Sequence, residues 1–175
     1  MDPSAATAVD GILLARRLAL ACIACVLAMG AIALGTGVTQ EEFEVLAPVT
    51  DYAARLTAAE PTLRILMAID TLFLGCYSAF FVAFAAVHHE GRVTALVKVG
   101  VGAMLATALL DIVEDHHILA MARAAVLSSP PDLAAIGWQQ IESQVKFNIS
   151  YLGLLLLGLG LPRRTPVELG FALSV

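Results

Sequence analysis

Charged residues are scarce in this 175-residue sequence: they make up 14% of the chain, against about 25% in a soluble globular domain. The ten lysines and arginines form no basic patch and the net charge is −5, which excludes nucleic acid as a partner. Hydrophobic residues make up 59% of the chain, more than the roughly 45–50% of soluble domains. This composition is typical of an integral membrane protein, whose first partner is the lipid bilayer.

Cysteine is also rare. Cys22, Cys25 and Cys76 all lie inside apolar runs, so a disulfide framework is not expected. The Cys22-x-x-Cys25 spacing resembles a redox pair, but no base lies nearby in this apolar stretch to lower a thiol pKa. We interpret the three residues as small buried hydrophobes.

Four long apolar runs occupy most of the chain. A bilayer span needs about 20 such residues, so we predict an all-α integral membrane protein, a single transmembrane domain over residues 1–175 folded as an up-down four-helix transmembrane bundle. A signal peptide is the alternative for the first run, but the charge-free stretch 18–40 exceeds the about 7–15 residues of its apolar region. The predicted spans are approximately 16–37, 63–87, 93–125 and 141–161.

The connections contain further signals. Residues 39–64 form an acidic first loop, in which we expect Pro61 to begin the second span. Asp132 is placed to cap a short segment before the last span. A turn is expected around 88–92. A helical period predicts a short amphipathic surface helix in the first loop from Val49, Tyr52, Ala53 and Leu56.

Glycines in the last two spans indicate close helix packing. Small residues let helix backbones approach one another in membranes. We expect such contacts at Gly100, Gly102, Gly153, Gly158 and Gly160.

The basic residues predict an orientation. In the four-span topology, six of the ten lie on the side of both termini, and the positive-inside rule makes that side cytoplasmic. These six are Arg16, Arg17, Arg92, Lys98, Arg163 and Arg164.

The stretch from Leu110 to His117 places three carboxylates and two imidazoles near the end of an apolar run. Ionisable groups at membrane depth are costly and usually mark a functional site. With about 1.5 Å per helical residue, the alternating spans bring acids of the second and third spans and Lys146 of the fourth into the same outer half of the membrane. The predicted ligand- or ion-binding residues are Asp70, Tyr77, Asp111, Glu114, Asp115 and Lys146.

The charge of this group is unbalanced. Its four acids face the single inward base Lys146, which we expect to pair with Asp111 or Asp70; Glu142, four residues before it, is another candidate partner. Because unpaired buried charges are costly, some carboxylates should hold protons or the site should hold a cation.

A divalent metal is an alternative ligand. Glu114-x-x-His117 has the spacing found in di-iron carboxylate bundles, and the candidate metal ligands are Asp70, Asp111, Glu114 and His117. Haem is not expected, because His88 and His89 suit the membrane interface and no second inward histidine is evident.

These motifs resemble a family. Asp70-x-x-Phe73-x-x-x-Tyr77, then Leu110-Asp111-x-x-Glu114, then Lys146 at the opening of the last run is similar to a family of small four-span bacterial membrane proteins. Members carry an aspartate in the second helix, a Leu-Asp-x-x-Glu-Asn signature in the third and a lysine in the fourth. The resemblance implies the fold, the site and the bacterial inner membrane, and it carries no activity. Asp115 departs from the signature asparagine.

Three functions remain open from the sequence. The first is an outward-facing site that binds or translocates a proton, a cation or a small cationic solute. The second is a membrane-embedded, metal-dependent enzyme. The third is an accessory or structural subunit of a larger membrane complex, with other membrane subunits as partners.

Overall fold

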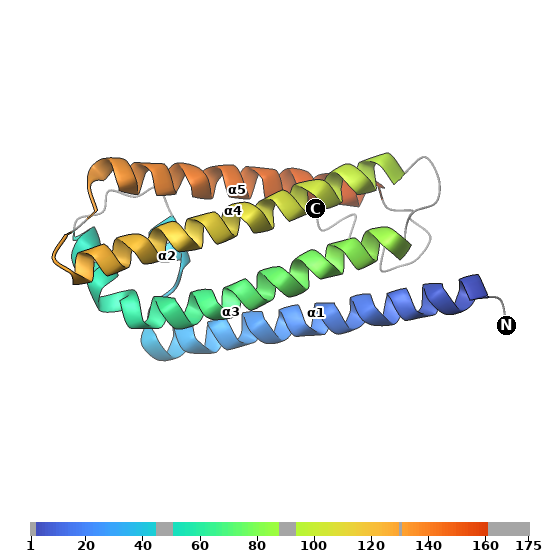
Figure 1. The fold of residues 1–175 in the computed structure, drawn as a ribbon, viewed down its shortest axis with the longest axis horizontal. Helices are drawn as coiled ribbons and strands as arrows, with labels where there is room; N and C mark the ends of the chain where they lie inside the picture. The colour runs from blue at the N-terminus through green and yellow to red at the C-terminus, as the bar shows by residue number, and fades with distance from the viewer. Residues whose placement is uncertain (1–2, 45–50, 88–93, 130, 161–175) are drawn as a thin grey trace. The chain divides into compact units, whose positions relative to one another are not determined.

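The computed structural model describes residues 3–44, 51–87, 94–129 and 131–160, and every element in these ranges is a helix (Figure 1). The prediction of an all-α chain is therefore confirmed for the described residues. The predicted turn at 88–92, Val49 and the arginines at 163 and 164 lie outside these ranges. The helices are α1 (Pro3–Thr36), α2 (Glu41–Glu44), α3 (Tyr52–Val87), α4 (Thr94–Val126) and α5 (Leu133–Gly160).

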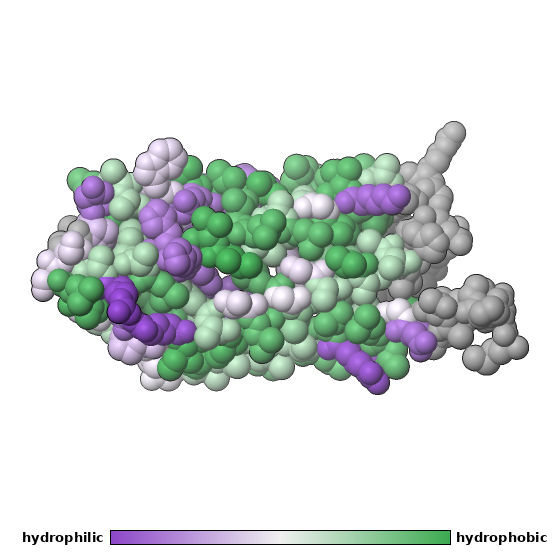
Figure 2. Space-filling view, in the orientation of Figure 1, coloured by the Kyte–Doolittle hydropathy of each residue, from purple (hydrophilic) through white to green (hydrophobic). Residues whose placement is uncertain are grey.

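Three of the helices are long and apolar enough to cross a membrane: Asp10–Thr36, Tyr52–Ala86 and Ala95–Val126. Many of their exposed residues are apolar too, and the face drawn in Figure 2 is largely hydrophobic. On α1 alone, Leu20, Leu27 and Leu34 are all exposed. Helix α5 has 28 residues, but its first half carries glutamines, Glu142 and Lys146, so it is not among the three. The four-span bundle therefore stays a prediction.

Helix α1 begins at Pro3, well before the predicted start near residue 16. The first residues include several alanines, which favour a helix in water as well as in a membrane. The end of the helix agrees with the predicted boundary near 37: Gly37 has φ of 72°, and its N–H donates to the Ala33 carbonyl at 2.8 Å. A left-handed glycine with this bond is a common helix end.

Helix α3 begins at Tyr52, eleven residues before the predicted start of the second span. Pro61 therefore lies inside the helix, and the separate surface helix does not exist. Tyr52 and Leu56 are 4% and 0% exposed, so the helical period marks a core face. Burial of this face outweighs the one hydrogen bond that a proline removes from a helix.

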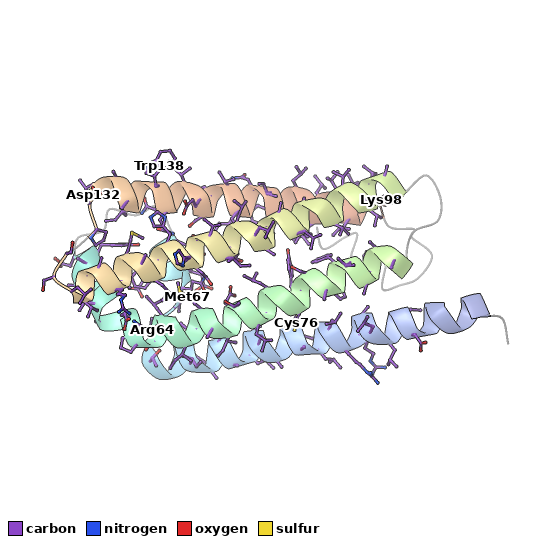
Figure 3. All side chains as sticks on the ribbon, viewed as in Figure 1. Arg64, Met67, Cys76, Lys98, Asp132 and Trp138 are labelled. Carbon is purple, nitrogen blue, oxygen red and sulfur yellow. The ribbon has the colours of Figure 1, made fainter. Side chains whose placement is uncertain are left out.

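Helix α5 also begins earlier than predicted, at Leu133 instead of about 141. The Asp132 cap is confirmed, since the Ala135 N–H donates to Asp132 Oδ1 at 2.8 Å. The capped segment is α5 itself, and Trp138 projects from its first turns (Figure 3). Helix α4 matches the predicted third span to within one residue at each end.

The chain divides into two compact units. The unit that holds the acidic residues consists of Ile23–Phe73 and Leu109–Lys146. Its core joins α2, α3 and α4 and contains, among others, Phe43, Leu56, Leu63, Met67 and Ile118. The other unit consists of Met1–Cys22, Leu74–Ala108 and Phe147–Val175, with a core formed by Phe81, Val97, Val101, Met104 and Leu157.

Three of the predicted glycines, Gly100, Gly153 and Gly160, bring α4 and α5 together in this second core. A Cβ added at Gly100 would lie 3.0 Å from the Gly153 carbonyl oxygen and 3.1 Å from the Leu157 nitrogen. Gly160 is similarly close to Val97. Gly102 was predicted to do the same and does not, because nothing lies within 4 Å of its added Cβ.

We expect Gly100→Ala to lower stability by about 1–3 kcal/mol, because its methyl group meets helix backbone that cannot move aside cheaply. Thermal denaturation in detergent measures the loss. Gly102→Ala, two residues away on the same helix, is the matched control. It should leave the melting temperature unchanged or raise it, since alanine favours helix over glycine by up to about 1 kcal/mol. Equal effects of the two changes would contradict the close packing at Gly100.

Candidate functional site

The site lies in the unit formed by Ile23–Phe73 and Leu109–Lys146 and draws residues from four helices. Helix α2 provides Glu44, α3 provides Asp70, and α5 provides Lys146; these three side chains are all at least nine-tenths buried. Helix α4 provides Asp111, Glu114 and Asp115, whose spacing of three and four residues places them on one helix face.

Lys146 is the cation of this site. Its Nζ lies 3.2 Å from Glu44 Oε1, 2.8 Å from Asp111 Oδ1 and 2.5 Å from Glu114 Oε2. The ammonium donates hydrogen bonds to Glu44 and Asp111 and forms an ion pair with Glu114, so one cation serves all three carboxylates. The pairing of Lys146 with Asp111 agrees with the prediction, whereas the alternative partner Glu142 is engaged elsewhere.

Glu114 is held from α5 by two further groups. Gln139 Nε2 donates to Glu114 Oε1 at 2.9 Å, and the Ser143 hydroxyl donates to the same oxygen. Glu114, Gln139 and Ser143 are all 0% exposed. Reasoning from the sequence missed Gln139 and Ser143. The available signal was their spacing, because residues 139, 143 and 146 follow the i, i+4, i+7 pattern of one helix face.

A second group of carboxylates lies beside the first. Asp70, Asp111 and Asp115 each offer an oxygen within 4.8 Å of the others. Gln40 Nε2 donates to Asp115 Oδ1 at 2.5 Å. The second oxygens of Asp70 and Asp115 are buried and accept no hydrogen bond from any group in the described part of the chain.

Glu44 is another residue that the sequence did not reveal, since it belongs to the connection predicted to be a surface loop. It is 5% exposed. Burial raises the pKa of the Glu44 carboxyl from 4.5 to about 7; the Lys146 ammonium opposes the rise, and the Glu114 carboxylate adds to it. Glu44 therefore changes charge near neutral pH, where an ordinary glutamate stays ionised.

The predicted metal set is not formed. His117 points to α5, where its Nδ1 lies 3.0 Å from Glu142 Oε2. Among the described residues, the two acidic groups with metal-like spacing are Glu44, Asp111 and Glu114, and Asp70, Asp111 and Asp115. His117 is in neither. From its angular position on α4, His117 was predicted to lie beside Glu114. Its nearest acid is instead Glu142 on α5.

Tyr77, the remaining predicted site residue, belongs to the other unit. There its ring meets Phe81 edge to face, with 4.8 Å between ring centroids, and it borders the apolar core. The structure thus brings together Asp70, Asp111, Glu114, Asp115 and Lys146 in one unit, whereas Tyr77 belongs to the other.

No family model, no curated protein and no solved structure matches this chain. The resemblance to four-span bacterial proteins therefore stays a prediction, and we infer the function from the geometry of the site.

Proposed function

We propose that this chain is a four-span protein of the bacterial inner membrane with both termini in the cytoplasm. The three apolar helices support the membrane location. Helix α5 would be the fourth span, since 28 residues extend roughly 42 Å at 1.5 Å per residue. Six of the ten basic residues then lie on the cytoplasmic side, which places the carboxylates in the outer half of the membrane.

The function we propose is binding a proton or a cation at these carboxylates and exchanging it with the outer aqueous phase. The observation that carries the proposal is the excess of acid over base. Five carboxylates and one ammonium would have a formal charge of −4 if all were ionised: Glu44, Asp70, Asp111, Glu114, Asp115 and Lys146.

Such a charge does not persist in a buried site. The ionised form of an isolated buried carboxylate is so unfavourable that the group takes up a proton or a cation instead. The raised pKa of Glu44 is consistent with bound protons near neutral pH. Membrane proteins commonly use acidic residues at this depth for proton relays and ion pathways.

A structural role is the second candidate, and the contacts of Lys146 favour it. One ammonium joins Glu44 on α2 to Asp111 and Glu114 on α4. Polar side chains often hold membrane helices together. A purely structural role does not need Asp70 to change its protonation state, whereas proton exchange at these carboxylates does, so the two functions differ in a measurable way.

The test is difference infrared spectroscopy on proteoliposomes, between about pH 5 and pH 8, where exposed carboxyl groups are mostly ionised. We expect the wild-type protein to show the C=O band of protonated carboxyl groups at the lower pH and to lose part of it at the higher pH. Asp70→Asn should reduce the change. Asp132→Asn, the same substitution at an exposed helix cap, should leave it as in the wild type.

A spectrum without a pH-dependent carboxyl band would contradict the proposed function and favour the structural role. If Asp70→Asn left the band unchanged, the exchanging proton would have to be bound outside this site. Asparagine caps helices as well as aspartate does, so the control variant should fold normally.

A further inference from the structure

The two groups of three carboxylates differ in what neutralises them. In the first, Lys146 Nζ lies within 3.2 Å of an oxygen of Glu44, Asp111 and Glu114. The second group has the same close spacing of carboxylate oxygens. Asp111 belongs to both, but within the described ranges no lysine, arginine or histidine forms an ion pair with Asp70 or Asp115.

A separate observation concerns two buried oxygens of the second group. Asp70 and Asp115 are 7% and 5% exposed. In each, Oδ2 receives no hydrogen bond from the described residues, although buried polar atoms are nearly always satisfied. Asp111 joins the two groups, since its Oδ1 accepts a hydrogen bond from Lys146 at 2.8 Å.

One member of the group, Asp115, also borders a cavity. A cavity of about 280 Å³ between α3 and α4 is lined by Asp115 together with Thr71, and by the apolar Met67 and Ile112. Arg64 and His116 lie at this cavity as well. Arg64 is already paired with Glu60 at 2.5 Å, so its charge is partly balanced before a cation enters. Figure 3 shows Arg64 and Met67 on α3.

We propose that Asp70, Asp111 and Asp115 bind one hard divalent cation of the Mg²⁺, Mn²⁺ and Ca²⁺ class. Carboxylate oxygens are the ligands these ions prefer, and a set without sulfur or imidazole disfavours softer metals. A divalent cation would change the formal charge of the site from −4 to −2. It would neutralise carboxylates of the second group as Lys146 does those of the first. This inference rests on the proposed function and identifies the cation that competes with protons there.

The test uses Mn²⁺ with the purified full-length protein in detergent, because the electron paramagnetic resonance signal of free Mn²⁺ falls when the ion binds. We expect one Mn²⁺ per chain, displaced by Mg²⁺ or Ca²⁺. Asp70→Asn and Asp115→Asn should each weaken binding at least tenfold. Asp132→Asn is the matched control and should bind as the wild type does.

Two variants are used so that a folding failure in one leaves the other informative, and circular dichroism confirms the helix content of both. No bound Mn²⁺ in the wild type, or equal binding by wild type and both variants, would overturn the metal site. A pH-dependent carboxyl band without Mn²⁺ binding would refute the metal and leave the proposed function intact. Mn²⁺ binding that removes the carboxyl band would support both.

Discussion

Lys146→Ala is expected to be the most destabilising single change in the site, with a loss of about 3–5 kcal/mol, the range for removing one partner of a buried ion pair. Its ammonium contacts three carboxylates and is 4% exposed, so alanine leaves all three without their cation. Thermal denaturation in detergent measures the loss. Lys98→Ala is the control, because Lys98 is an exposed lysine on α4, and surface charges contribute little.

A second substitution tests whether the two charges share a site. Asp111→Asn in the Lys146→Ala background removes one of the carboxylates left without a cation and should restore part of the lost stability. The recovery should be partial, since Glu44 and Glu114 also lose their partner. The coupling between two residues in contact is typically about 0.5–3 kcal/mol. Strictly additive losses would mean that Lys146 and Asp111 act independently.

Glu44→Gln is expected to change how stability depends on pH. The folded-state pKa of about 7 exceeds the ordinary 4.5, so the folded protein binds this proton more tightly than the unfolded chain does. That contribution to stability is fully present below pH 4.5 and is lost as the pH rises to about 7. The shift corresponds to about 3 kcal/mol at 1.36 kcal/mol per pKa unit.

Glutamine keeps the shape of the protonated side chain and does not titrate. The stability of Glu44→Gln relative to wild type should therefore rise by up to about 3 kcal/mol between pH 4.5 and 7, as measured by denaturation at several pH values. Glu41→Gln is the control, because Glu41 is an exposed glutamate on the same short helix. The stability of this variant should depend on pH as that of the wild type does. A constant difference between Glu44→Gln and wild type would contradict the assigned titration.

Much of the helix content was readable from the sequence, because long apolar runs act locally. The boundaries of α4 agree to within one residue, and the end of α1 and the Asp132 cap were also predicted. The pairing of Lys146 with Asp111 could be predicted as well. Few bases occur in these runs, so Lys146 was the one inward base available to pair with their acids.

Other features were decided by the tertiary structure. Tyr52 and Leu56 looked like the apolar side of a surface helix, and only the core around Phe43 and Ile118 shows that α3 begins there. His117 was placed by its own helix, but the position of Glu142 on α5 decided its partner. A helical period predicts on which side of its helix a residue lies. It does not predict which residues of other helices contact that side.

Glu44 illustrates the physical reason most clearly. Four acids in the short stretch 41–51 read as a solvated loop, and nothing local distinguishes Glu44 from the others. It differs because the ammonium of Lys146, 102 residues later in the chain, lies 3.2 Å from Glu44 Oε1. Composition and periodicity determined that the chain forms long apolar helices. Which carboxylates share a cation depended on contacts between distant segments, which local sequence does not encode.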